Sequence, residues 1–113
     1  MNRGTMPRRG EVRWVRLDPA LGSEIAETRP CLIVSSNIVN ERRSTVVVVP
    51  LSTSPQRKPP LLVPVRCAGR DAVAVIDQVR AISKERLDRR IGELSLEHLE
   101  AVEQGLREVL ELG

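Results

Sequence analysis

Residues 45–52 read Thr-Val-Val-Val-Val-Pro-Leu-Ser, and they form the strongest strand signal in this chain of 113 residues. Valine is β-branched and favours extended backbone, and an unbroken apolar run indicates a strand that is buried on both faces. Shorter segments of similar character surround it. We expect further strands at residues 11–18, 30–35, 61–66, 72–76, 77–83 and 90–94, with short helical turns at 36–44 and 84–89.

The end of the chain predicts one helix. Ser95 suits the N-cap, and Glu97 in the first turn interacts favourably with the helix dipole. Apolar residues then recur at helical spacing on one face: Leu96, Leu99, Val102, Leu106, Val109 and Leu110. Short strands followed by a single helix predict a mainly β fold, a small and strongly bent antiparallel barrel. Residues 1–9 read as a basic, disordered leader and 10–113 as one domain.

Composition limits the kind of core that the chain can build. Trp14 is the only aromatic residue, so the core must consist of Val, Leu and Ile. A small domain without large aromatic side chains gains little from its own core, and we therefore expect a homodimer. We place Trp14 in the core rather than on the surface as a platform for bases. His98, in the first turn of the helix, is expected to be solvated.

The charge of the chain is unevenly distributed. The net charge is +3, but residues 95–113 carry five acidic residues and one arginine, so the rest of the chain is strongly basic. Basic surface attracts polyanions.

Cys31 and Cys67 do not have the spacing of metal ligands, and a single histidine excludes a zinc site or a histidine-pair nuclease. We expect no metal and no cofactor. The absence of a signal peptide or long apolar run predicts a cytoplasmic protein.

Two residues suit phosphodiester chemistry. Arg29 lies between Thr28 and Pro30, which restricts its backbone to extended conformations, and its guanidinium stays charged and matches two phosphoryl oxygens. Ser52 places a hydroxyl at the end of the valine strand. Each has an ordinary alternative when considered alone: a surface arginine at a strand end, and a hydroxyl that caps a turn. Glu24 reads equally well as a solvated loop charge.

Taken in order, these segments resemble a known family. The series consists of Arg9-Gly10-Glu11-Val12, Gly22-Ser23-Glu24, Thr28-Arg29-Pro30, residues 45–52 and Asp77-Gln78-Val79-Arg80. It resembles the MazF/PemK (Kid-like) toxins of type II toxin–antitoxin systems over nearly the whole chain. The resemblance implies an SH3-like barrel that forms a homodimer and cleaves single-stranded RNA, commonly mRNA, at short motifs without a metal. It also implies an antitoxin with a disordered tail, which the basic groove predicts to be acidic.

The resemblance also assigns site residues. The family's catalytic arginine corresponds to Arg29 and its catalytic threonine to Ser52, while Glu24 is a candidate proton acceptor. The RNA-binding residues that it predicts are Ser23, Thr28, Thr53, Asp77, Gln78 and Arg80. This chain departs from the family at two positions. Ile25 stands where the family has glutamine, and Glu27 stands where it has a glycine two residues before the arginine.

The simplest chemistry without a metal uses the 2′-OH of the RNA as nucleophile and leaves a 2′,3′-cyclic phosphate and a 5′-OH. Arg29 would stabilise the charged phosphorane, and Ser52 would donate a hydrogen bond to a phosphoryl oxygen. Base recognition is expected from backbone groups, Asp77, Gln78 and stacked arginine planes. Two alternatives stay open: a toxin of the same fold that poisons a protein such as DNA gyrase without chemistry, as CcdB relatives do, and a non-catalytic RNA-binding module.

Overall fold

The computed structural model describes residues 6–17, 27–53 and 58–113. These residues form β1 (Glu11–Arg16), β2 (Thr28–Ile33), α1 (Asn37–Arg42), β3 (Thr45–Ser52), β4 (Leu62–Cys67), β5 (Arg70–Val75), β6 (Arg80–Ser83), β7 (Leu87–Glu93) and α2 (Leu96–Val109). Two 3-10 turns, η1 (Ile76–Gln78) and η2 (Lys84–Arg86), precede β6 and β7. The mainly β fold with one long C-terminal helix is confirmed.

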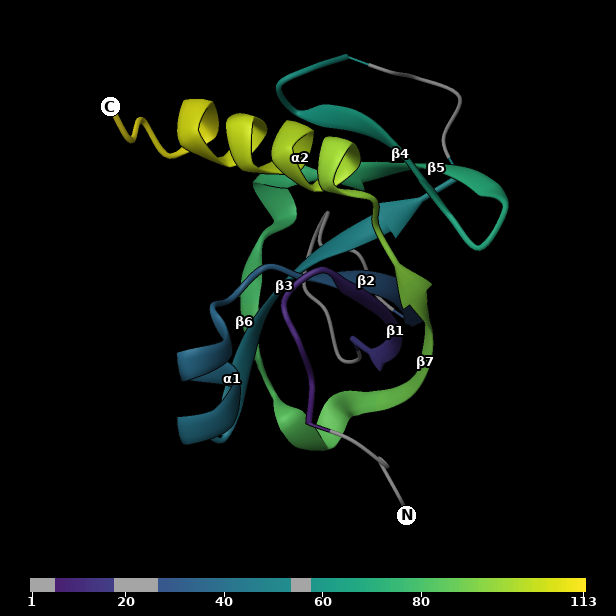
Figure 1. Cartoon of the computed structure of the whole chain (residues 1–113), viewed down its shortest axis with the longest axis vertical. Coiled ribbons are helices and arrows are strands. Elements are labelled where there is room, and N and C mark those ends of the chain that lie inside the picture. The colour runs from purple at the N-terminus through teal and green to yellow at the C-terminus, as the bar shows by residue number, and fades with distance from the viewer. Residues whose placement is uncertain (1–5, 18–26, 54–57) are drawn as a thin grey trace.

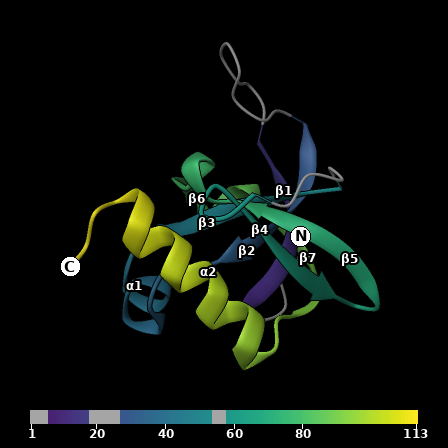
Figure 2. The ribbon, with the colours of Figure 1, turned by 90° about the horizontal axis from the view of Figure 1, so that it is seen from above.

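A single curled sheet contains all seven strands, with antiparallel pairing in the order β4-β5-β3-β2-β1-β7. β3 is central because its first half pairs with β6 and its last two residues pair with β5. Figure 1 shows β6 and β7 curving around the lower half of the sheet while α2 crosses its upper end. Seen from above, α2 lies over the β4–β5 side of the sheet, and α1 lies beside β3 (Figure 2).

The valine strand is buried on both faces, as its sequence predicts. Val49 and Leu51 belong to a core cluster that α2 covers, whereas Val46 and Val48 belong to a second cluster enclosed by β1, β2, β6 and β7. Two small cores on opposite faces of one strand explain how a chain without Phe or Tyr buries its apolar residues.

The terminal helix is confirmed, with a correction to its apolar face. The hydroxyl of Ser95 accepts a hydrogen bond from the backbone N–H of His98, as an N-cap should. Leu99, Val102, Leu106 and Val109 pack against the core. Leu96 and Leu110 do not, since they are 74% and 51% exposed.

Three further expectations need correction. Residues 77–83 do not form one strand, because the chain makes the η1 turn before β6 begins at Arg80. The turn expected at 84–89 ends at Arg86, so β7 begins earlier than expected and pairs with β1. β2 begins at Thr28 rather than at residue 30. In each case pairing with a distant strand, which local propensity does not report, decides the boundary.

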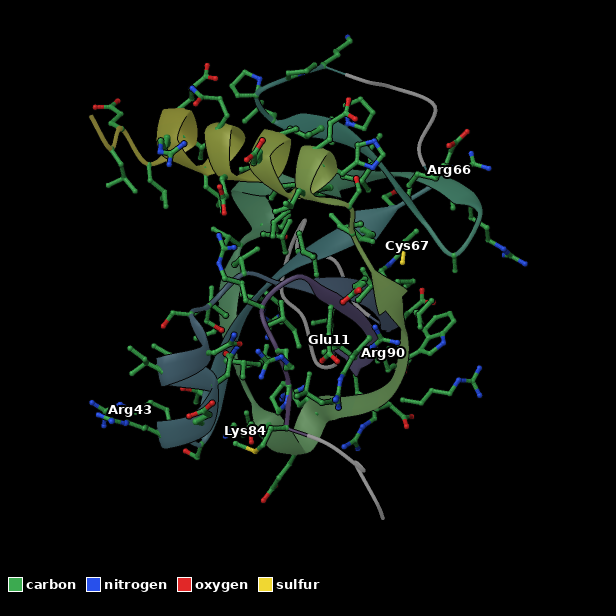
Figure 3. All side chains as sticks on the ribbon, in the orientation of Figure 1. Glu11, Arg43, Arg66, Cys67, Lys84 and Arg90 are labelled. Carbon is green, nitrogen blue, oxygen red and sulfur yellow. The ribbon has the colours of Figure 1, made fainter. Side chains whose placement is uncertain are left out.

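Buried charges hold β7 beside β1. Glu11 accepts hydrogen bonds from the Nε atoms of Arg13 (3.3 Å) and Arg90 (3.1 Å), and Arg13 is only 1% exposed. Figure 3 shows Glu11 and Arg90 pointing toward each other.

The backbone N–H of Arg9, within the expected leader, donates to the side-chain oxygen of Asn37 at 2.8 Å. No helix in the described part of the chain is long and apolar enough to cross a membrane.

Candidate functional site

A cavity of about 390 Å³ opens where β2 begins and β3 ends, and it faces the β4–β5 hairpin and β7. It contains both residues that the sequence nominates for catalysis, Arg29 and Ser52. Among the described residues, its lining consists of Val12, Trp14, Arg29, Pro30, Leu51, Ser52, Thr53, Cys67, Ala68, Arg70, Asp71, Ala72 and Ile91.

The register of β2 and β3 brings Arg29 and Ser52 to the same end of the sheet. Cys31 pairs with Pro50, Leu32 with Val49 and Ile33 with Val48. If this antiparallel alignment is continued outward by two residues, Arg29 comes opposite Ser52. Pro30 has no backbone N–H and cannot donate to such a ladder. The pairing of β2 with β3 therefore stops at Cys31 and Pro50, and Arg29 and Ser52 line the cavity beyond it.

Arg29 has one buried hydrogen-bond donor to account for. Its Nε atom is buried and has no hydrogen-bond partner among the described residues. A buried donor without a partner costs about 1–3 kcal/mol, and native proteins rarely leave one in place. A phosphoryl oxygen in the cavity would satisfy this donor, because guanidinium groups bind phosphate through parallel hydrogen bonds.

The far wall of the cavity comes from the β4–β5 hairpin. Cys67 packs against β7, where its sulfur lies 3.1 Å from the position that a Cβ on Gly92 would occupy. Arg66 and Cys67 lie at the opposite end of the molecule from Arg43 and Lys84 (Figure 3). Burial raises the pKa of the Cys67 thiol, and the charge of Arg90 opposes this effect. The thiol is thus a neutral part of the wall at physiological pH.

The charges of Arg80 and Arg29 both act on Cys31, which is completely buried as a member of the second core cluster. Burial raises the pKa of this thiol from its ordinary 9.0 to about 12, although both arginines lower it. Arg80 thus lies near the same buried cysteine as Arg29. Arg80 lies opposite Val48 of β3 and does not line the cavity.

The remaining predicted site residues are divided between several places. Thr53 lines the cavity with Arg29 and Ser52, but Thr28 lines a separate hollow with Arg16 and Arg86. Adjacent residues of a strand point to opposite faces, which explains why Thr28 and Arg29 separate. Asp77 and Gln78 lie in the η1 turn, outside the cavity. The predicted residues Ser23 and Glu24 lie outside the described residues.

Sequence reasoning did not identify three cavity residues: Trp14, Arg70 and Asp71. Trp14 is half-buried, so it is a core residue only in part. Arg70 and Asp71 follow the Gly69 turn, where a pair of opposite charges at a hairpin tip is too common to indicate a site. His98 is likewise not simply solvated, since its Nδ1 accepts a hydrogen bond from the backbone N–H of Arg66 at 3.2 Å.

The described residues contain no group of three or more His, Cys, Asp or Glu side chains that could hold a metal ion. What the cavity offers instead is two arginine cations, Arg29 and Arg70, hydroxyl groups from Ser52 and Thr53, a carboxylate from Asp71 and a largely apolar wall. This set of groups can bind an anion next to an apolar ring, and it can stabilise negative charge that develops on that anion.

Comparison with known proteins identifies relatives over nearly the whole chain. Residues 8–110 match the family described as PemK-like, MazF-like toxin of type II toxin–antitoxin system. Endoribonuclease MazF9 of Mycobacterium tuberculosis is 35% identical over 116 residues, which cover 95% of this chain and 98% of that protein. Endoribonuclease EndoA of Bacillus subtilis is 32% identical over 105 residues, with 88% and 90% covered.

Solved structures agree with these matches. An endoribonuclease in complex with its cognate antitoxin, from a mycobacterial species, is 27% identical and has a TM-score of 0.78, with 95% of this chain and 97% of that chain covered. MazF from Deinococcus radiodurans has a TM-score of 0.85 at 22% identity, with 96% and 99% covered. The latter likeness concerns the fold.

Proposed function

Because the chain belongs to the PemK-like, MazF-like toxin family of type II toxin–antitoxin systems, we propose that it is an endoribonuclease that cuts single-stranded RNA in the cavity of Arg29 and Ser52. This assignment to the cavity rests on the buried Nε of Arg29, which has no hydrogen-bond partner among the described residues, and on the presence of Ser52 in the same cavity. The RNA is messenger RNA in the cytoplasm, cut at a short sequence motif.

The proposed reaction uses the 2′-OH of the nucleotide on the 5′ side of the cut. Its oxygen attacks the adjacent phosphorus, its proton passes to an acceptor, and the bond from phosphorus to the 5′-oxygen breaks. That oxygen leaves as a 5′-OH after taking up a proton, and a 2′,3′-cyclic phosphate remains. Atoms and charge balance in this step without a metal or a cofactor.

Each cavity residue has a role that follows from its chemistry. Arg29 stabilises the extra negative charge of the phosphorane, because its planar guanidinium is a cation whose N–H groups match two phosphoryl oxygens. Ser52 donates a hydrogen bond to a non-bridging oxygen, and Thr53 binds the neighbouring nucleotide. Glu24 and a water molecule remain the two candidate proton acceptors. Ser23, Thr28, Asp77, Gln78 and Arg80 remain predicted contacts to RNA further along the strand.

The partners follow from the same family membership. One structural relative was solved in complex with its cognate antitoxin. We propose that an antitoxin also binds this chain, that its binding segment is acidic because residues 1–94 are basic, and that the toxin acts as a homodimer.

The test is incubation of the purified full-length protein, in EDTA, with matched RNA and DNA oligonucleotides that are long and unstructured. The proposal expects cutting of RNA only, with cyclic phosphate ends, and loss of cutting in Arg29→Ala and Ser52→Ala. Arg107→Ala and Ser44→Ala are matched controls, because these exposed residues lie outside the cavity and should cut normally. Intact RNA together with growth arrest on expression would overturn the proposal in favour of a toxin that acts on a protein target.

A further inference from the structure

The cavity has more apolar wall than a phosphate group requires. Val12, Pro30, Leu51, Ala72 and Ile91 line it together with the charged and hydroxyl groups. A phosphate is strongly hydrated and gains nothing from aliphatic contacts, whereas binding sites for flat organic rings are mostly apolar with a few polar groups. The volume of about 390 Å³ leaves room for a ring beside the anion.

Trp14 gives this apolar wall its one aromatic surface. It is the only aromatic residue of the chain, it lies opposite Pro30 in β2, and it is half-buried. Next to it the pairing of β7 with β1 is irregular: Val12 pairs with Gly92 but Arg13 pairs with Arg90, so Ile91 is an extra residue. Such bulges redirect side chains and often lie beside active sites. Proteins that bind single-stranded RNA stack its bases on aromatic side chains.

Asp71 supplies the cavity with a hydrogen-bond acceptor. Its Oδ1 accepts a hydrogen bond from the Arg66 guanidinium at 2.7 Å, across the paired strands β4 and β5. The side chain is 60% exposed, and no bond to its Oδ2 is found in the described parts of the chain. An ionised carboxylate can only accept hydrogen bonds. A ligand edge that faces Asp71 must therefore present N–H groups.

We infer that the cavity holds one unstacked nucleobase of the RNA, packed on Trp14 with its Watson–Crick edge toward Asp71. This inference rests on the proposed function for its choice of RNA as ligand. The carboxylate selects bases that carry an amino group on this edge, which are guanine, adenine and cytosine. It disfavours uracil, whose single N–H on this edge lies between two carbonyl oxygens that the carboxylate repels.

The experiment measures base preference in two ways. Wild-type protein and Asp71→Asn are given an RNA library randomised around the cleavage site, and the cut ends are sequenced. Both proteins are also titrated with 2′-O-methyl RNA oligonucleotides that differ at one position, which cannot be cut through a 2′-OH. Asparagine has nearly the same shape as aspartate but both donates and accepts hydrogen bonds.

At one position of the motif, the expected result is a preference for amino-bearing bases over uracil that falls about tenfold or more in Asp71→Asn. Asp88→Asn is the matched control, since Asp88 is an exposed carboxylate of β7 outside the cavity and should keep the wild-type preference. Trp14→Leu should weaken binding about tenfold at this same position, whereas Trp14→Phe keeps a stacking ring and should restore most of it. Thermal unfolding of each variant separates these effects from loss of fold.

An unchanged base preference in Asp71→Asn, with normal cutting, would overturn this inference and leave the proposed function intact. The converse result is also informative. If the wild type cuts no RNA but binds the 2′-O-methyl oligonucleotides with the predicted dependence on Asp71, the base site is supported and the proposed cleavage is refuted. Equal binding of all four bases by the wild type would overturn the inference whether or not RNA is cut.

Discussion

Cys31 of β2 lies directly opposite Pro50 of β3, and this pairing sets the alignment that brings Arg29 and Ser52 into one cavity. A shift of one residue would turn one of the two side chains to the other face of the sheet, because side chains alternate along a strand. The buried valines of β3 resist such a shift, since it would turn each of them out of the core cluster in which it packs and toward the other one. The core of this small protein thus also fixes the geometry of its proposed active site.

The hydroxyl of Ser52, rather than the shape of the side chain, should matter for cleavage. Ser52→Thr keeps the hydroxyl and is expected to cut RNA within a few fold of the wild-type rate. Ser52→Val has the shape of threonine without the donor, and kcat should fall on the order of 10²–10³-fold. Single-turnover cleavage of one oligonucleotide measures both. Equal rates for Ser52→Val and Ser52→Thr would remove Ser52 from the chemistry.

Arg29→Lys should be a poor replacement although it keeps the positive charge. Lysine has no planar fork to hold two phosphoryl oxygens, and its shorter reach would leave the position of Nε empty. We expect a loss of kcat/KM of at least about tenfold, which single-turnover rates would show. Arg107→Lys, on the exposed face of α2, is the control and should not change the rate. Full activity of Arg29→Lys would contradict bidentate binding.

The buried thiol of Cys31 should make stability fall at alkaline pH. Burial raises its pKa from 9.0 to about 12. Below pH 9 the thiol is therefore protonated in both the folded and the unfolded chain, and its titration does not change the free energy of unfolding. Between pH 9 and about 12 the unfolded chain releases this proton and the folded chain does not. The free energy of unfolding should then fall by up to about 1.4 kcal/mol per pH unit.

Denaturant unfolding at pH 8, 9 and 10 measures this slope, and the chain has no tyrosine that would titrate in the same range. Cys31→Val should flatten the slope, whatever its effect on stability at pH 8. Cys67→Val is the control, because Cys67 is only half-buried and should change the slope less. A slope that is the same in all three proteins would show that Cys31 is not the group responsible.

Glu27 has a backbone conformation that suits glycine. Its φ of 71° lies in the left-handed region, which costs residues with a Cβ about 1 kcal/mol or more. Glu27→Gly should therefore be more stable than Glu27→Ala by about 1 kcal/mol in denaturant unfolding. Both variants lose the same glutamate side chain, so their difference isolates the backbone. A more stable alanine variant, as at ordinary positions, would contradict this account.

Gly105 allows α2 to approach the rest of the fold closely. A Cβ at this position would lie 3.1 Å from the carbonyl oxygen of Pro60 and 3.2 Å from side chains of Ile76 and Val63. Gly105→Leu should lower the free energy of unfolding by about 1–3 kcal/mol, because the helix must move away from the core. Gln104→Leu, the exposed neighbour on the same helix, serves as the control, and equal stability of the two variants would refute the close approach.

Local sequence predicted best those elements whose buried residues form a regular pattern within the element itself. The valine run of β3 and the helix α2 were predicted correctly, apart from the exposed Leu96 and Leu110, because each pattern has only one arrangement that buries it. The η1 turn and the early start of β7 were missed because distant partners decide them. The same holds for His98, whose bond to Arg66 joins segments that are far apart in the chain.

The candidate site divides in the same way. By itself the sequence determined the chemical groups, an arginine held by proline and a hydroxyl at a strand end, and the ordered motifs that resemble the toxin family. Only the tertiary structure decided which groups share a cavity: it added Trp14 and Asp71 and separated Thr28, Asp77 and Gln78. The physical reason is that strand register and hairpin packing fix side-chain neighbours across the sheet, and neither is encoded in any short stretch of the chain.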